Sequence, residues 1–292
     1  MSIINSIATI GFFDGVHKGH QFLFHQLRQA ADQRGLSPVI VTFRQHPRQV
    51  LQSDYIPQLL TSTDERIALI EQVTGIQPTV LDFTAVNTLT AGEFLHLLNR
   101  EYHVTTLLMG YDHRFGSDRL RHPHEYKAAG EREGVEVVTM SEFTEGEMHV
   151  SSTEIRQDLE HGNILVANEL LGRPYQLTGT VVHGKGIGRN IGFPTANIQP
   201  NDPCKIIPKS GVYKVKVNGE LPALLNIGTN PTVGNSEQTI EVHIPNWKGN
   251  LYDSQITICF ERYIREERKF ESLDALREQI EADFSIVLGQ GR

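Results

Sequence analysis

The sequence predicts an α/β protein of two domains: a doubly wound parallel sheet, then a small antiparallel β-barrel with a terminal helix. Three observations support this prediction. The chain has 292 residues, about twice the length of a typical domain. Short apolar runs alternate with helical patterns through the first half. Beyond residue 172 the pattern is mostly strand, with clusters of Gly, Pro and Asn. We therefore expect domains at 1–172 and 173–292.

The expected strands of the first domain are apolar on both faces, which is typical of a parallel sheet covered by helices. These strands are Ile7–Phe12, Pro38–Phe43, Pro78–Asp82, Val104–Met109 and Val135–Met140. Helical spacing of apolar residues predicts helices at Gln21–Arg34, Thr63–Val73, Ala91–Glu101 and Pro123–Glu133. This alternation predicts a ligand site at the carboxyl ends of the strands.

The pattern changes after residue 150. Two short helices are expected at Ser151–His161 and Ile164–Leu171, closed by Gly172. The barrel strands are expected at Leu177–His183, Gly211–Val217, Pro222–Ile227, Thr239–Ile244 and Gln255–Tyr263. The tail, Leu273–Val287, has its apolar residues on one helical face, so we expect it to pack on the barrel.

Composition excludes several classes of protein. The formal net charge is −8 and no basic block occurs, so no nucleic-acid partner is expected. Cys204 and Cys259 form neither a metal-binding spacing nor a disulfide framework, which favours a reducing compartment. The first residues have neither the basic region nor the long apolar core of a signal peptide, so none is expected, and no run is long enough to span a membrane. We expect a cytoplasmic protein without membrane contact, and the oligomeric state stays open.

A glycine-rich segment with two histidines, GFFDGVHKGH, joins the first strand to the first helix. Gly11 and Gly19 would let backbone N–H groups approach a phosphate at the helix N-terminus, and Asp14 lies in the same phosphate-binding segment. His17 and His20 can face that pocket and stabilise charge on a phosphoryl group. The alternative is a structural turn with two surface histidines.

Two more polar segments follow. VSSTEIR contains Ser152, Thr153 and Arg156, whose hydroxyls and guanidinium suit a helix start that grips a polyphosphate. GYDHRFG contains Asp112 and follows the strand that ends at Met109, so it lies at another strand carboxyl end. The alternatives are an ordinary helix cap for the first segment and an ordinary loop for the second.

The H-x-G-H segment, the G-x-D-x-x-F-G loop and the S-S-T-x-I-R segment together resemble the adenylyltransferase module of the bacterial bifunctional riboflavin kinase/FAD synthetases. The resemblance implies a Rossmann-like nucleotidyltransferase that joins FMN to AMP and releases pyrophosphate. It implies that the histidines stabilise charge at the phosphates and that Ser152, Thr153 and Arg156 hold the β- and γ-phosphates. Asp112 would contact flavin or nucleotide. Phe12 departs from the Asn that is frequent there, which concerns contacts to the nucleotide rather than activity itself.

Two nucleotide motifs are excluded in the second half. The run from Gly179 begins like a Walker A loop, but Gly186 stands where Ser or Thr is needed. The glycines that follow fail G-x-G-x-x-G, because Ile191 occupies the third glycine position. In the remaining segment, GRNIGFPTAN, Thr195 and Asn197 would point the same way if extended and could hold Mg²⁺ beside ATP phosphates. The alternative is a turn rich in Gly, Pro and Asn.

Glu241 and His243 share one face of a predicted strand. A carboxylate near a bound hydroxyl suits a general base for phosphoryl transfer. The alternatives are a solvated glutamate, or a zinc site, for which further ligands are missing.

In their order along the chain, these segments resemble the riboflavin kinase barrel from about Tyr175 to Asp283. The resemblance implies that Thr195 and Asn197 bind Mg²⁺ and phosphate and that Glu241 activates the ribityl 5′-hydroxyl. It also implies further contacts to phosphate or flavin. The phosphate contacts are Gly184, Gly188 and Arg189, in a flap, and the flavin contact is Arg265.

The expected protein is therefore a bifunctional transferase. It would phosphorylate riboflavin to FMN and then adenylylate FMN to FAD, with ATP as co-substrate and Mg²⁺ as cofactor. One alternative is a riboflavin kinase beside a degenerate adenylyltransferase domain. The other is a non-catalytic flavin sensor.

Overall fold

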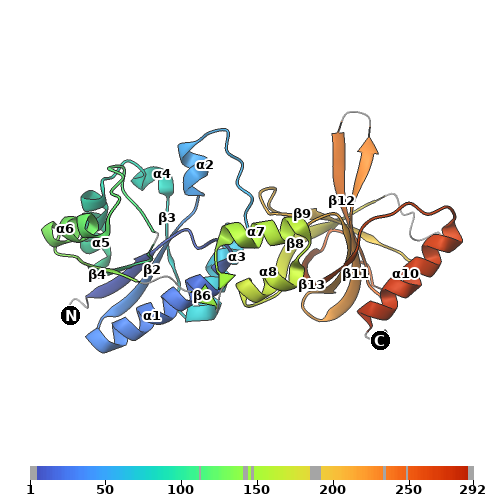
Figure 1. Ribbon diagram of the computed structural model, residues 1–292, viewed down its shortest axis with the longest axis horizontal. Helices are drawn as coiled ribbons and strands as arrows, with labels where there is room; N and C mark the ends of the chain where they lie inside the picture. Colours follow the sequence, from blue (N-terminus) through green and yellow to red (C-terminus); the bar gives the residue numbers. More distant parts are fainter. Residues whose placement is uncertain are drawn as a thin grey trace. The chain divides into compact units, whose positions relative to one another are not determined.

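The computed structural model describes residues 5–111, 113–140, 144–145, 148–184, 192–232, 235–247 and 249–288. Its contacts divide the chain into two compact units, Met1–Ser152 and Thr153–Arg292. Figure 1 shows a sheet between helices in the first unit and a barrel with flanking helices in the second. The predicted fold class is confirmed.

The first unit is built on a parallel sheet in the order β3-β2-β1-β4-β5. The strands are β1 (Ser6–Ile10), β2 (Ser37–Phe43), β3 (Thr79–Leu81), β4 (Val104–Met109) and β5 (Glu136–Thr139). From β1 the chain builds the sheet first to one side and then to the other. The carboxyl end of β1 is therefore the switch point at which such folds bind ligands.

Helices cover both faces of this sheet (Figure 1). The helices are α1 (Lys18–Arg34), α3 (Thr63–Thr74), α5 (Ala91–Tyr102) and α6 (Pro123–Arg132). Successive residues of β1 enter different cores: Ile7 is clustered with Phe24 of α1, and Ala8 with Leu95 of α5. This confirms the inference drawn from strands that are apolar on both faces. The shorter elements are η1 (Asp14–Val16), α2 (Pro47–Leu51), α4 (Phe83–Val86), β6 (Thr144–Glu145) and β7 (Met148–His149).

The first helix begins at Lys18, earlier than the predicted start at Gln21. His17 is its N-cap residue, with extended backbone angles of φ −70° and ψ 171°. Strand β1 ends at Ile10 rather than Phe12. The H-x-G-H segment therefore lies across the start of α1, and the N-terminus of a helix is a favourable place for an anion.

The second unit is a closed barrel of antiparallel strands in the order β10-β11-β12-β9-β8-β13. The strands are β8 (Tyr175–Val182), β9 (Ala196–Pro200), β10 (Gly211–Val217), β11 (Leu221–Thr232), β12 (Asn235–His243) and β13 (Gln255–Arg265). The terminal helix α10 (Leu273–Val287) packs on the barrel through Phe284 and Val287, as predicted.

Strand β9 was missed by the sequence analysis. It is short, it begins two residues after Pro194, and it ends at Pro200, so its own residues favour a turn. Pairing with β12 on one side and β8 on the other makes it a strand. A strand whose stability comes from such long-range ladders leaves a weak local signal.

Two short helices precede the barrel, α7 (Ser152–His161) and α8 (Ile164–Leu171). The side chain of Asn168 on α8 donates to Phe260 O of β13 (2.8 Å) and accepts from Tyr175 N of β8 (2.7 Å). Contacts therefore group α8 with the barrel and divide the chain after residue 152, whereas the expected boundary lay after residue 172. The expected functional boundary stays a prediction.

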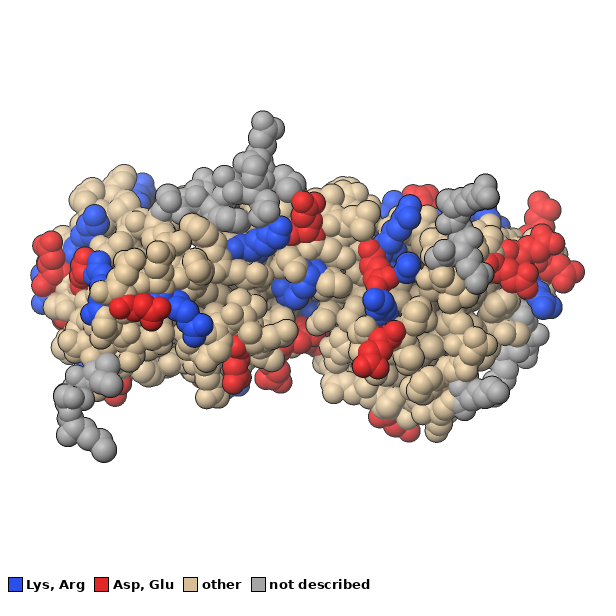
Figure 2. All heavy atoms as spheres, turned by 90° about the horizontal axis from the view of Figure 1, so that it is seen from below, with Lys and Arg blue, Asp and Glu red and all other residues tan. Residues whose placement is uncertain are grey.

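Surface charge is mixed in sign. On the face in Figure 2, basic and acidic side chains alternate and no continuous basic area is visible. Within the described part of the chain, no helix is long and apolar enough to cross a membrane.

Candidate active sites

A tight turn follows β1 and leads into α1. Gly15 has a positive φ of 80°, a conformation that glycine adopts without strain. At Gly19, a Cβ atom would lie 3.2 Å from the His17 ring and 3.4 Å from Val150 O. A glycine there lets the chain around Val150, distant in sequence, lie directly against the start of α1.

The two histidines of this turn lie side by side. The rings of His17 and His20 are stacked, with centroids 3.6 Å apart and planes at 20°. His17 is 5% exposed, and the edge of Phe13 packs against His20. The structure thus places two imidazoles at the N-terminus of a helix, at the switch point of the sheet, where they can donate hydrogen bonds to phosphate oxygens.

Asp14 is buried and binds the turn to the segment that precedes α3. Its carboxylate accepts hydrogen bonds from Leu60 N, Thr61 N and Thr61 Oγ1, each at 3.0 Å, while Gly15 N donates to Thr61 Oγ1 (3.0 Å). The sequence analysis assigned Asp14 to phosphate binding and overlooked Thr61. The Ser62–Glu65 capping box at the start of α3 is the signal that marks this segment as a helix start.

We expect Asp14→Asn to lower the stability of the first unit by about 1–3 kcal/mol, because one amide N–H₂ would face backbone N–H groups that now find an acceptor. Trp247, the one tryptophan, lies in the second unit. On heating, far-UV circular dichroism should therefore show part of the chain unfolding at a lower temperature than in the parent. The transition followed by Trp247 fluorescence should stay at the parental temperature. Identical unfolding of variant and parent would contradict this role.

The segment after β7 reaches the same turn. Ser152 Oγ donates to Asp14 O (2.9 Å), so the structure brings Ser152 next to the H-x-G-H segment. Its role in phosphate binding stays a prediction. Thr153 and Arg156 follow on α7, in the second unit; Thr153 is exposed and Arg156 is half-buried. Asp112 lies outside the described residues.

A second cluster of polar groups lies on the barrel, where three strands meet. Thr195 Oγ1 donates to Glu241 Oε2 (2.9 Å). In the strand register, Glu241 of β12 stands opposite Asn197 of β9 and opposite Asn226 of β11. Spacing in the sequence predicted a shared face for Thr195 and Asn197, and the structure places Glu241 beside Thr195 and opposite Asn197.

Gly184 lies against Asn197. A Cβ atom at Gly184 would fall 1.9 Å from Asn197 Nδ2, so any other residue there would displace this amide. The next part of the predicted flap, which includes Gly188 and Arg189, lies outside the described residues.

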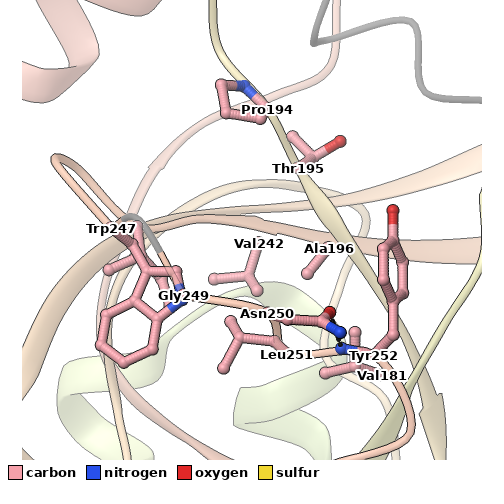
Figure 3. A pocket seen from close by; sticks show the side chains of 11 residues that line it. Val181, Pro194, Thr195, Ala196, Val242, Trp247, Gly249, Asn250, Leu251 and Tyr252 are labelled. Carbon is pink, nitrogen blue, oxygen red and sulfur yellow. Dashed lines mark hydrogen bonds between the residues drawn. The ribbon is translucent and has the colours of Figure 1, made fainter.

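Two cavities meet at Thr195, which lines both. The smaller, of about 130 Å³, has Trp247 and Tyr252 on opposite sides with Val242 between them (Figure 3). His183 stacks on Tyr252 with ring centroids 4.0 Å apart. The larger cavity measures about 360 Å³ and combines apolar walls with several polar side chains. Its lining includes Phe193, Leu224, Asn226, Glu241, Arg265, Glu267 and Phe270.

Helix α10 closes the larger cavity through a buried ion pair. Arg265 Nη2 lies 2.7 Å from Asp283 Oδ2, and Nε also donates to this carboxylate, which is 2% exposed. Arg265 lines the cavity as well, so its predicted contact with flavin would come from a side chain that already anchors α10.

His243 supports the segment that carries Thr195 and leads into β9. Its Nδ1 lies 2.7 Å from Pro194 O, and its ring packs against Phe193 and Phe284. Burial lowers the pKa of His243, and the hydrogen bond to Pro194 opposes this only in part. The neutral ring therefore donates from Nδ1 and holds Pro194, next to Thr195, in place.

Two family models match this chain, one over most of each unit. The family model described as FAD synthetase matches residues 2–154, and the model described as riboflavin kinase matches residues 171–288. The bifunctional riboflavin kinase/FMN adenylyltransferase of Escherichia coli (strain K12) is 36% identical over 283 residues, which cover 95% of this chain and 90% of that protein. The chain belongs to the bifunctional riboflavin kinase/FMN adenylyltransferase family.

Another relative and a solved structure are also similar to this chain over nearly its whole length. The bifunctional riboflavin kinase/FMN adenylyltransferase of Bacillus subtilis (strain 168) is 36% identical over 95% of this chain and 90% of that protein. A solved structure named as a macrolide-efflux protein from Streptococcus pneumoniae is 31% identical, covers 98% of this chain and 95% of that chain, and superimposes with a TM-score of 0.88.

The family assignment confirms the predicted activities. The chain is a transferase with riboflavin kinase and FMN adenylyltransferase activities, and its substrates are ATP and flavins. The family models leave residues 155–170 unassigned, so they place all of α8 but its last residue in neither module.

Proposed function

We propose that riboflavin is phosphorylated at the pair formed by Thr195 and Glu241. The observation that carries this proposal is the 2.9 Å hydrogen bond between them, at the wall shared by two cavities. In a kinase, the phosphoryl group passes from ATP to the hydroxyl acceptor, and each substrate would occupy one of the two cavities. The wall that touches both substrates is where the transfer would take place.

The two cavities suit different substrates. The smaller has Trp247, Tyr252 and the ring of His183 beside it, and these stack well on a nucleobase. The larger has apolar walls with Asn226 and Glu267 among its polar groups, which fits a tricyclic flavin with hydrogen-bonding edges. We therefore assign ATP to the smaller cavity and riboflavin to the larger, with Arg265 as a flavin contact. Gly184, Gly188 and Arg189 would cover the phosphates.

The side chains beside the ATP cavity suit a magnesium ion. A hydroxyl from Thr195 and an amide oxygen from Asn197 are hard oxygen donors, and the carboxylate of Glu241 lies next to them. Thr195 and Asn197 would hold Mg²⁺, with phosphate oxygens and water as the other ligands. When bound, Mg²⁺ neutralises charge on the ATP phosphates.

Glu241 would accept the proton of the ribityl 5′-hydroxyl while the hydroxyl oxygen attacks the γ-phosphorus of ATP and ADP leaves. Thr195 orients the carboxylate by donating to Oε2. The remaining task of the site is to align the two substrates and exclude water, which dominates catalysis of phosphoryl transfer.

In the first unit, we propose that the FMN phosphate attacks the α-phosphorus of a second ATP and that pyrophosphate leaves. The attacking phosphate is already an anion, so no protein nucleophile is needed. His17 and His20 would stabilise charge at the phosphates, while the backbone between Gly11 and Gly19, which includes Asp14, approaches them. Ser152 would hold the β- and γ-phosphates, and Asp112 would contact flavin or nucleotide. Thr153 and Arg156, which follow Ser152 in the chain, stay sequence predictions for contacts to the same phosphates.

A time course tests the whole proposal. With riboflavin, ATP and Mg²⁺, chromatography should show FMN rising first and FAD following, and removal of Mg²⁺ with a chelator should stop the first step. FMN that accumulates without FAD would point to a degenerate first unit. Riboflavin that stays bound and unconverted would point to a flavin sensor. We retain the cytoplasm as the expected location.

A further inference from the structure

A fully buried arginine lies beneath the turn that follows β1. Arg66, on α3, is 0% exposed, and its Nη2 donates to Phe43 O at the end of β2 (2.6 Å). Burial lowers the pKa of Arg66 to about 10, against the opposing effect of the Asp14 charge. The side chain is therefore a cation at neutral pH, held in a place where charge is costly.

The guanidinium group touches the turn through Phe12. Its Cζ lies 4.0 Å from the centroid of the Phe12 ring, the distance of a cation–π contact. Phe12 is fixed from other sides too, because its carbonyl accepts from Thr42 Oγ1 (3.1 Å) and its ring meets the edge of His46. Arg66 thus connects the carboxyl ends of β1 and β2, which form the edge where the H-x-G-H segment begins.

The hydrogen bonding of Arg66 is incomplete. Among the described residues, Nε and Nη1 of this buried side chain have no hydrogen-bond partner. The described ion pairs include none to Arg66. An apolar residue of similar size would avoid this desolvation, so stability alone does not account for an arginine here. The charge of Asp14 offsets this cation only in part, because burial still lowers the pKa of Arg66. A buried cation beside a phosphate-binding turn raises the potential that draws anions to it.

We propose that Arg66 is a positioning residue for adenylyl transfer. It holds Phe12, and with it the start of the H-x-G-H segment, through the face of the ring. Its charge also offsets that of the ATP phosphates bound there. This inference rests on the proposed site for FAD formation. It gives Phe12 a function, since an asparagine at that position would present no ring face to the guanidinium.

The test uses the full chain with Arg66→Met and Arg66→Lys, and follows FAD formation from FMN at varied ATP concentrations. We expect Arg66→Met to raise the KM for ATP and reduce kcat/KM about 10- to 100-fold. Arg66→Lys, which keeps the charge, should recover part of this loss. A purely structural arginine would lower the active fraction without changing the KM of folded enzyme. Unchanged kcat and KM in Arg66→Met would overturn the proposal.

Two controls separate the possible causes. Arg100→Met removes an exposed arginine from α5 of the same unit and should leave FAD formation unchanged. Riboflavin phosphorylation by the same samples reports that the second unit is intact.

If Arg66→Met fails to fold, the Phe12→Leu variant is measured instead: a raised KM for ATP supports the proposal, and parental kinetics overturn it. His20→Ala, measured alongside, tests the proposed site itself, and full activity there would count against that site rather than against Arg66 alone.

Discussion

Replacing Glu241 by Gln should stop riboflavin phosphorylation while the chain still converts added FMN to FAD. Glutamine keeps the size of the side chain and can still accept a hydrogen bond from Thr195, so the strand pair should persist. The amide cannot take a proton from the ribityl hydroxyl. General-base catalysis contributes about 10²–10⁴ in rate, which sets the expected loss in kcat.

The measurement is the initial rate of FMN formation, with FAD formation from supplied FMN measured on the same sample. Glu220→Gln is the matched control, because Glu220 is an exposed carboxylate of the same unit and should leave both rates unchanged. A Glu241→Gln enzyme that phosphorylates riboflavin within a few-fold of the parent would remove Glu241 from the chemistry. Loss of both activities in a folded protein would show that the assignment of one reaction to each unit is wrong.

His20→Ala should have the opposite effect, with FAD formation lost and FMN formation kept. His20 stacks on His17 at the N-terminus of α1, so its removal takes away one of the two imidazoles that can donate to the phosphates. Loss of one such electrostatic contact typically lowers kcat about 10²–10³-fold. The riboflavin kinase reaction takes place in the other unit and should continue, so FMN should accumulate.

Accumulation of FMN from riboflavin, followed by chromatography, is the readout. His25→Ala is the matched control, since His25 is exposed on the same helix and faces solvent. FAD formation at the parental rate in His20→Ala would contradict the proposed role of the histidine pair. A variant that loses FMN formation as well would contradict the independence of the two sites.

Most helices and strands of this protein could be predicted from local sequence, and the exceptions depend on contacts with distant parts of the chain. Strands β1 and β4 are rich in apolar and β-branched residues, and α3 and α5 begin with capping boxes, so their own residues specify them. Strand β9 is the counter-example, because it becomes a strand only through its partners β8 and β12.

The candidate sites divide in the same way. The sequence by itself determined the family, the two activities and the groups of residues proposed for each, because the motifs H-x-G-H, S-S-T-x-I-R, G-F-P-T-A-N and E-V-H are short and keep their chemistry within a few residues. The spacing of Thr195 and Asn197 predicted a shared face, and the structure places Glu241 beside them.

Only the tertiary structure decided which groups far apart in the chain support those motifs. In the folded protein, the Asp14 carboxylate accepts hydrogen bonds from Thr61 and Arg66 packs against Phe12. Thr195 lies in the wall between two cavities. Nothing in the residues next to Arg66 marks it as buried or as a neighbour of the first strand. Burial and desolvation depend on what the whole fold packs around a side chain, so the pattern of neighbouring residues in the sequence does not predict them.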